Sequence, residues 1–199
     1  MIAKSICTAL VAALFAVLVV AFGGIAARAG ETKTAIFAGG YFWCVEAAFD
    51  EVEGVTETIS GYAGGTKPNP TYGDHEGYQE AVKVTYDPAK VSYAKLLDHY
   101  WHNIDPFDPD GQFCDKGSAY HSVVFVGNDE EKMLAETTKE EIAKRFNRPV
   151  ATAIKPVTTF TPAEDYHQDY HNQNPVSYKY YKWACGRAQR LEQIWGKPS

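Results

Sequence analysis

The feature that most constrains this chain is an apolar run that ends in two glycines and continues as an aromatic stretch. The run covers residues 33–38, the glycines are Gly39 and Gly40, and Tyr-Phe-Trp-Cys-Val-Glu follows. This order predicts a strand, a tight turn and the N-terminus of a helix. The unpaired N–H groups and partial positive charge of a helix N-terminus favour anions and lower the pKa of a nearby thiol. The stretch therefore suits a reactive thiolate, and it contains one cysteine, Cys44.

The N-terminal part of the chain, residues 1–29, differs in composition from the rest. Residues 6–22 are apolar apart from Thr8, and Ala27-Arg28-Ala29 follows as an A-x-A cleavage site. This layout predicts a secretory signal peptide that is removed before residue 30. An uncleaved membrane anchor is the alternative, because the apolar run approaches the length that spans a bilayer. On either interpretation the folded part lies outside the cytoplasm, and we expect an exported, periplasmic protein.

Residues 30–199 are expected to form one domain, because a chain with 45% hydrophobic residues supplies an ample core at this length. Removing residues 1–29 removes two of the 19 basic residues and no acid, so the charge is 17 − 25 = −8. An acidic domain of this kind argues against nucleic-acid binding. Three cysteines remain, Cys44, Cys114 and Cys185. An odd number leaves at least one thiol free, intermolecular or redox-active, and the pairing stays open.

Strand and helix patterns alternate along the folded part. We predict strands at 33–38, 55–62, 79–86, 122–126 and 151–160, and helices at 42–52, 92–101, 129–146 and 163–170. A long loop is expected at 104–120, and an aromatic-rich tail, helical or irregular, at 177–195. Ser92 is the expected N-cap of the second helix, and Asn128 or Asp129 that of the third; Pro156 indicates an edge strand. The fold class expected is α+β, a two-layer sandwich with helices packed on a mostly antiparallel sheet, a ferredoxin-like core and an irregular C-terminal tail.

Residues suited to catalysis recur outside the opening stretch. Tyr72 lies in a Gly/Pro-rich loop, Glu80 begins the most regular strand, and Asp115 and Tyr120 lie in the long loop. A glutamate among apolar neighbours can have a raised pKa through desolvation and then acts as a general acid. Taken singly, Glu80 is equally well an outward-facing strand residue, and Tyr72 and Tyr120 are loop residues that cover core. Trp43, taken alone, is most simply a core residue.

Several motifs together resemble the class A peptide-methionine sulfoxide reductases. The matching residues, which span about residues 34 to 195, are Gly40, Phe42, Trp43 and Glu46; Gly61-Tyr62-x-Gly64-Gly65; Pro68-Asn69-Pro70-Thr71-Tyr72; Glu80-Ala81-Val82; Asp115-x-Gly117-x-x-Tyr120; Ala163-Glu164-x-x-His167-Gln168-x-Tyr170; and Asn174-Pro175. The resemblance implies reduction of methionine (S)-sulfoxide, in oxidised proteins or as the free amino acid.

The resemblance also implies a mechanism. A cysteine thiolate at the helix N-terminus attacks the sulfoxide sulfur while Glu80 protonates the departing oxygen. Tyr72, Tyr120 and Asp115 hydrogen-bond this oxygen, and Phe42 and Trp43 form the pocket for the methyl group. The resulting sulfenic acid is resolved by a second cysteine, for which Cys185 in the tail is the natural candidate, and then by a thioredoxin-type reductant. We expect no bound cofactor, no nucleic-acid partner, no membrane contact beyond the N-terminal segment, and a monomer.

One position departs from this pattern. The attacking cysteine belongs immediately before Phe42, where this chain has Tyr41. A phenol, with a reference pKa near ~10, cannot form a sulfenic acid. Cys44 lies about 4.5 Å further along the helix and about 60° around it, and is the candidate substitute nucleophile; the alternative is a small buried hydrophobe. Cysteine and tyrosine codons differ by one base, so a recent change at this position is a further explanation.

Two functions follow from this departure. The chain is either a reductase that uses Cys44, or a catalytically inactive family member that binds oxidised-methionine segments. Histidine pairs with chelating spacing occur at His99 and His102 and at His167 and His171. Because no third ligand with suitable spacing accompanies either pair, we predict no metal site.

Overall fold

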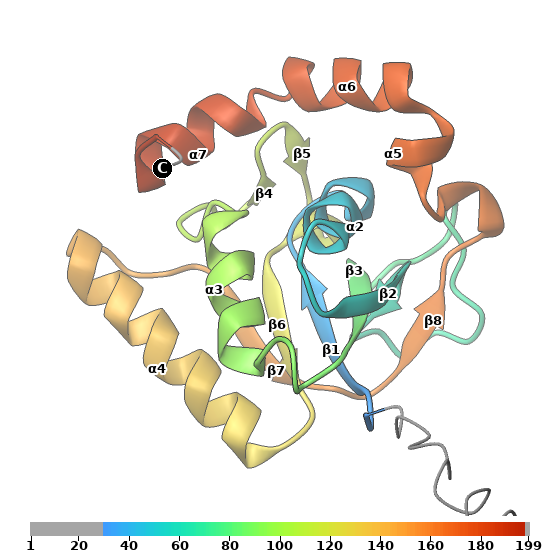
Figure 1. Ribbon diagram of the computed structural model, residues 1–199. Coiled ribbons are helices and arrows are strands. Elements are labelled where there is room, and N and C mark those ends of the chain that lie inside the picture. The colour runs from blue at the N-terminus through green and yellow to red at the C-terminus, as the bar shows by residue number, and fades with distance from the viewer. Residues whose placement is uncertain (1–29, 198–199) are drawn as a thin grey trace, which may run out of the picture.

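The computed structural model describes residues 30–197, and its centre is a six-stranded sheet (Figure 1). The predicted signal segment, residues 1–29, lies outside the described residues. The strand order is β7-β6-β1-β3-β2-β8. The strands are β1 (Lys33–Ala38), β2 (Val55–Ala63), β3 (Gln79–Tyr86), β6 (Val123–Val126), β7 (Ala153–Pro156) and β8 (Phe160–Pro162). Every pair in this sheet is antiparallel except β6 and β7, which confirms the mixed α+β class with a mostly antiparallel sheet.

The described part of the chain contains six α-helices. They are α2 (Phe42–Asp50), α3 (Tyr93–His102), α4 (Asp129–Phe146), α5 (Tyr170–Gln173), α6 (Pro175–Ala184) and α7 (Arg187–Trp195). The N-cap expected at Ser92 is confirmed, because its side chain accepts a hydrogen bond from the Lys95 N–H. Of the two candidates for α4, Asn128 is the N-cap and accepts from the Glu131 N–H, whereas Asp129 is the first helical residue. Among residues 30–197, no helix combines the length and the apolar character that a membrane span requires.

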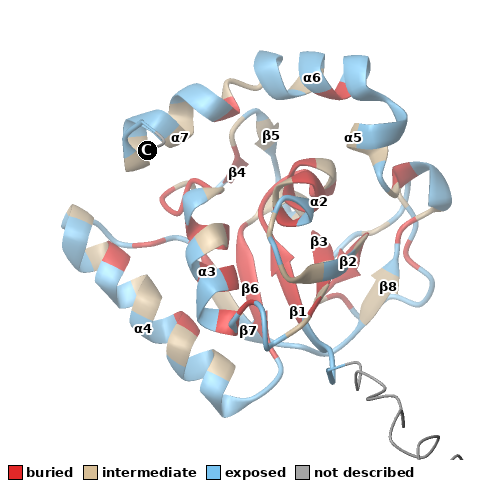
Figure 2. Cartoon of the chain, in the orientation of Figure 1, coloured by how far each residue is buried: buried red, intermediate tan, exposed pale blue. Residues whose placement is uncertain are grey.

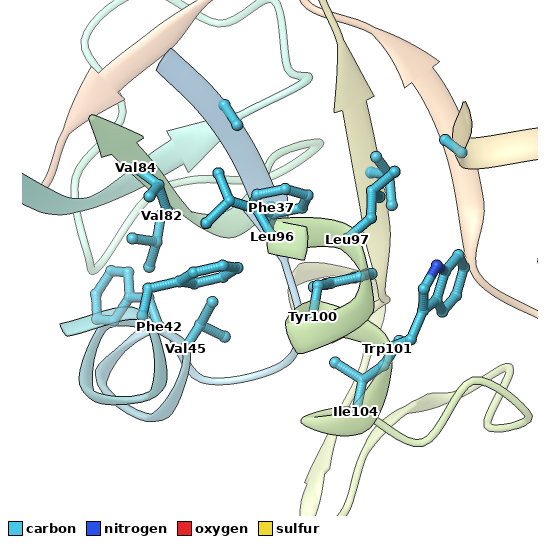
Figure 3. Close-up of a cluster of buried hydrophobic side chains, with 14 of the residues drawn as sticks. Phe37, Phe42, Val45, Val82, Val84, Leu96, Leu97, Tyr100, Trp101 and Ile104 are labelled. Carbon is cyan, nitrogen blue, oxygen red and sulfur yellow. The ribbon is translucent and has the colours of Figure 1, made fainter. Parts of the chain in front are cut away.

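The main core lies between the sheet and helices α2 and α3. Figure 3 shows the sheet residues Phe37 and Val82 facing Phe42, Leu96 and Tyr100 of the helices. A smaller apolar cluster covers the opposite face of the sheet. Figure 2 shows buried residues along the central strands, whereas the outer sides of α4, α6 and α7 are exposed. Alternation along β3 therefore separates two faces, and even-numbered residues of this strand point toward α2.

The structure corrects three expectations. The strand predicted at 151–160 is two strands, because after Pro156 the chain leaves the sheet beside β6 and crosses to pair β8 with β2 at the opposite edge. The edge position predicted from Pro156 is confirmed. The helix predicted at 163–170 is a 3-10 turn, Asp165–His167, followed by the one-turn helix α5. The irregular form expected for the tail is wrong, and the helical alternative for residues 177–195 is confirmed by α6 and α7.

Candidate active site

The N-terminus of α2 is positioned by the turn that follows β1. Gly40 has φ +90°, and a Cβ at this position would lie 2.6 Å from the Cβ of Gln112. Gln112 is fully buried and fixed by hydrogen bonds to the backbone N–H and carbonyl of Asp105, at 2.8 and 2.7 Å. Only glycine fits between these constraints. The conformation of this turn therefore places Tyr41 at the N-cap of α2.

Glu80 lies on the central strand β3 and points at this helix N-terminus. Its side chain is completely buried, and its Oε2 accepts a hydrogen bond from the Phe42 N–H at 3.1 Å. Oε1 has no hydrogen-bond partner among the described residues. Burial raises the pKa of Glu80 to about 8, with Asp115 adding to the rise and the Phe42 N–H opposing it. The carboxyl group therefore keeps its proton at neutral pH and can donate it from the unpartnered side.

Tyr41 fills the space in front of the helix. Its side chain is 8% exposed and its hydroxyl lies 2.9 Å from the Tyr72 hydroxyl. The ring centroid lies 4.4 Å from that of Trp43, 5.3 Å from Tyr181 and 6.3 Å from Tyr120. Burial raises the pKa of Tyr41 far above its usual range, and the hydrogen bond to Tyr72 raises it further. Tyr41 is consequently a neutral phenol, and it occupies the position at which the resemblance places the attacking thiol.

Phe42 and Trp43 form an aromatic wall beside Tyr41. Phe42 is fully buried, with its ring centroid 4.9 Å from that of His167. Trp43 stacks in parallel on Tyr170, and its Nε1–H donates to Nδ1 of His167 at 3.1 Å. Because Nδ1 accepts, the neutral His167 ring carries its proton on Nε2. Burial lowers the pKa of His167, which favours this neutral form.

The long loop contributes the remaining polar residues. Strands β4 (Gly111–Gln112) and β5 (Asp115–Lys116) form a short hairpin, and Tyr120 ends the 3-10 turn Ser118–Tyr120. Asp115 accepts a hydrogen bond from the Tyr181 hydroxyl. Burial raises the pKa of Asp115, whereas the Tyr181 hydrogen bond lowers it. Burial raises the pKa of both Tyr72 and Tyr120, and the neighbouring carboxyl groups of Glu80 and Asp115 add to the rise. The four polar residues named from the sequence therefore converge around Tyr41.

The three cysteines do not share this position. Cys114 and Cys185 form a disulfide with a Cα–Cα distance of 4.9 Å, so the candidate resolving thiol is paired. Cys44 is the free thiol of the described residues; it is 4% exposed and packs with Ala47 and Tyr178 in a cluster that Trp43 and Tyr181 also contact. Burial raises the pKa of Cys44. In this arrangement Cys44 is a small buried side chain, which is the second of the two alternatives given for it above.

Several residues that hold the site were missed or given no role from the sequence. Glu164 accepts hydrogen bonds from the Tyr62 hydroxyl and from the Tyr72 N–H, each at 2.9 Å, and so fixes the loop that carries Tyr72. Tyr181 contacts Tyr41 and holds Asp115. The spacing of Tyr178, Tyr181 and Cys185 at i, i+3 and i+7 was the available signal for an inward-facing side of a tail helix.

The histidines named as possible chelators have other partners. His99 Nε2 lies 2.8 Å from the Ala48 carbonyl oxygen, and His102 Nδ1 lies 2.8 Å from the Asp98 carbonyl oxygen. His171 Nε2 lies 3.4 Å from a carboxylate oxygen of Asp50. Asp50, Asp169 and His171 do bring three donor atoms within 4.8 Å of one another. Both carboxylates are exposed, as acidic surface pairs commonly are.

Comparison with known proteins decides the family. A family model described as "Peptide methionine sulfoxide reductase" matches residues 33–199. The chain belongs to this family. The relatives include "Peptide methionine sulfoxide reductase MsrA 2" of Rhizobium meliloti (strain 1021), 48% identical over 92% of this chain and 93% of the relative. The protein of the same description from Caulobacter vibrioides (strain ATCC 19089 / CIP 103742 / CB 15) is 46% identical over 92% of this chain and 96% of the relative.

Solved structures of the family share the fold. "Methionine sulfoxide reductase A of Corynebacterium diphtheriae" superposes with a TM-score of 0.66 at 29% identity, covering 73% of this chain and 76% of that one. The reduced form of Mxr1 from Saccharomyces cerevisiae also has a TM-score of 0.66 at 29% identity, covering 73% of this chain and 87% of that one. The family resemblance seen in the motifs thus extends to the architecture.

Proposed function

We propose that the protein reduces methionine (S)-sulfoxide, free or in oxidised proteins, to methionine by a thiol mechanism. The observation that carries the proposal is the buried Glu80 carboxyl, which keeps its proton at neutral pH beside a helix N-terminus and has one unpartnered oxygen. A sulfoxide is a poor electrophile until its oxygen is protonated or strongly hydrogen-bonded. Family membership and the names of the relatives support the same reaction.

The residues around Tyr41 suit a sulfoxide. With the Tyr41 ring displaced, the oxygen would accept from Glu80 and from the hydroxyls of Tyr72 and Tyr120, while Phe42 and Trp43 would contact the methyl group. A thiolate attacks the sulfur, the oxygen passes to the attacking sulfur as a sulfenic acid, and methionine leaves. A second thiol then forms a disulfide with release of water, and a dithiol reductant restores both thiols. The solved complex of Mxr1 with Trx2 supports a thioredoxin-type reductant for this chain.

Cys44 is the thiol that we propose for the attack. It lies in the first turn of α2, where the helix dipole stabilises a thiolate. Two obstacles separate it from the substrate, since Tyr178 covers the thiol and the Tyr41 ring occupies the pocket. Turnover therefore requires that both tyrosines move.

A second candidate function, binding of oxidised-methionine segments without turnover, is favoured by the same two obstacles. Tyr41 is a neutral phenol at the reactive position, and the Cys44 thiol is 4% exposed with a pKa that burial raises. If neither tyrosine moves, the aromatic and polar groups can still hold a sulfoxide at the rim of the pocket.

Turnover of a chiral methyl sulfoxide with dithiothreitol tests these functions on the unaltered protein, Cys44→Ser and Tyr41→Cys. Reduction of the (S)-sulfoxide that disappears in Cys44→Ser supports the proposed nucleophile. Absence of turnover until Tyr41→Cys restores it supports binding without turnover. An inert Tyr41→Cys protein with an unchanged circular dichroism spectrum contradicts the reductase function. Glu80→Gln in the active background is the control for acid catalysis, and its rate should fall by about 100-fold or more.

We also propose that the protein works outside the cytoplasm as a monomer. The Cys114–Cys185 disulfide supports this compartment, because disulfides persist in oxidising environments and are rare in the cytosol. Intact-mass measurement of protein recovered from the producing cells should give a chain that begins at Gly30. A mass that includes residues 1–29 would favour the membrane anchor instead.

A further inference from the structure

The Cys114–Cys185 disulfide joins the active-site loop to the helix that covers the site. Cys114 lies in the β4–β5 hairpin directly before Asp115, and Cys185 is the C-cap of α6, 71 residues later. Figure 1 shows α6 and α7 running along one end of the domain, past the β4–β5 hairpin and over α2. The disulfide therefore ties two segments that are distant in sequence, directly beside Asp115.

Only a narrow side of α6 contacts the domain. Tyr178 is the buried residue of this helix and packs on Cys44, and Tyr181 reaches Asp115 and the ring of Tyr41. The outer side is exposed, with Val176 81%, Tyr180 70% and Trp183 74% exposed. Because each large apolar side chain left in water contributes little to holding the helix, two tyrosines and the disulfide provide most of the attachment.

The segments on either side of α6 have stronger attachments of their own. Before it, Tyr170 of α5 stacks on Trp43. After it, Arg187 donates to the Asn103 carbonyl oxygen, and Arg190 Nε lies 2.7 Å from an Asp105 carboxylate oxygen. Gly186, with φ +66°, separates α6 from α7 directly after Cys185. The chain is thus fixed on both sides of residues 174–186, and a glycine lies at the point where that segment would bend.

We propose that the Cys114–Cys185 disulfide is a redox-controlled latch on α6, and that its reduction by a dithiol releases residues 174–186 and exposes the Cys44 thiol. Cys114 is exposed, so a reductant can reach it. A dithiol thiolate attacks a sulfur of the disulfide, the S–S bond breaks, and a mixed disulfide forms. The second thiol of the reductant completes the exchange, so that two electrons and two protons pass to Cys114 and Cys185 and the reductant leaves as a disulfide.

The latch couples the redox state to two parts of the site. Movement of Tyr178 uncovers Cys44, and movement of Tyr181 frees the Asp115 carboxylate and one side of the Tyr41 ring. Reduction would therefore uncover the Cys44 thiol by moving Tyr178, and it would remove one of the contacts that hold the Tyr41 ring in place. This inference rests on the proposed function for the role of Cys44, whereas its test reads thiol exposure and not turnover.

The test is the alkylation rate of Cys44 by iodoacetamide, followed by peptide mass spectrometry. In the full folded protein with the disulfide intact, Cys44 should react slowly, and dithiothreitol should raise its rate by about tenfold or more while circular dichroism stays unchanged. The double variant Cys114→Ser/Cys185→Ser should react at the fast rate without reductant and should not respond to dithiothreitol. Trp183→Ala, a change on the exposed side of α6, is the matched control and should stay slow.

Equal Cys44 rates in the oxidised and reduced forms overturn the latch. Fast alkylation that appears only together with loss of the circular dichroism signal also overturns it, because global unfolding would then explain the exposure. Reduction of the unaltered protein gives the comparison without any substitution if the double variant does not fold. Fast alkylation after reduction with no turnover would retain the latch and contradict the reductase function, so the two failures are distinguishable.

Discussion

Glu80→Gln should remove a large pH dependence from the stability of the domain. Glutamine keeps the size of the side chain and the oxygen that accepts from the Phe42 N–H, but it cannot lose a proton. In the native protein the Glu80 carboxyl titrates at about 8, whereas its ordinary value is 4.5. Because the native state holds this proton more tightly than the unfolded chain, Glu80 leaves stability intact below about pH 4.5. Stability then declines as the pH rises toward 8.

The magnitude follows from the two pKa values. Each pH unit between them removes about 1.4 kcal/mol of unfolding free energy, so the interval of about 3.5 pH units is worth up to about 5 kcal/mol. The side chain is completely buried, so screening by solvent does not reduce this figure further. Glu46, whose pKa burial raises to about 7, adds a similar decline to both proteins and cancels in their difference.

The assay is urea unfolding of the two proteins at pH 5, 6, 7 and 8, followed by circular dichroism. We expect the unfolding free energy of Glu80→Gln minus that of the unaltered protein to rise by several kcal/mol between pH 5 and pH 8. Parallel pH profiles would refute the reasoning, since they would mean that Glu80 ionises in the native protein near its ordinary pKa. In that case the carboxyl could not serve as the proton donor at neutral pH.

Three further predictions concern the turn, the disulfide and the aromatic wall. Gly40→Ala should lower the unfolding free energy by about 2–4 kcal/mol in a urea titration, because the added methyl combines a positive φ with a clash against the fixed Gln112. Gly73→Ala is the matched control, since no atom lies within 4 Å of the added methyl. It should change the unfolding free energy by under about 0.5 kcal/mol in the same titration. Cys114→Ser/Cys185→Ser should lower the thermal unfolding midpoint, because it removes a cross-link over 71 residues that stabilises the native state by up to about 4 kcal/mol. An unchanged midpoint would show that the unfolded chain gains no conformational freedom when the cross-link is lost. The His167 ring should give the nitrogen chemical shifts of the neutral Nε2–H form at pH 7, because its Nδ1 accepts from Trp43 and burial lowers its pKa below the ordinary value; a doubly protonated ring at that pH would contradict the hydrogen bond.

The sequence predicted those strands and helices whose bounds depend on neighbouring residues in the chain. The alternation of residues 79–86 predicts β3 to the residue, and short polar caps at Ser92 and Asn128 fix the starts of α3 and α4. The sequence could not divide residues 151–160 between two sheet edges, because the destination of a strand depends on its partners. Strand β8 pairs with β2, almost 100 residues earlier, and nothing local to Phe160 specifies that partner.

The candidate site also combines residues that sequence motifs identify with residues that only the folded structure brings close. Glu80, Tyr72, Asp115 and Tyr120 could be named together from motifs, and the structure gathers them around Tyr41. Tyr181 could not be named, because it reaches Asp115 from a helix 66 residues away. The burial of Cys44 was likewise open, since a position in the first turn of α2 suits both a reactive and a buried thiol. The side chain that covers the thiol in the structure, Tyr178, belongs to the tail.

The Tyr41 side chain occupies the candidate site and cannot diffuse away from it, because it is covalently part of the chain. Its ring lies among the aromatic side chains, and its hydroxyl meets that of Tyr72, much as a bound ligand would. Any external sulfoxide competes with a tethered phenol whose local concentration never changes, so its apparent affinity falls by the fraction of time that Tyr41 occupies the site. Truncating this side chain would leave a vacancy of about the size of its own ring, into which free phenol could bind, as apolar molecules enter engineered cavities.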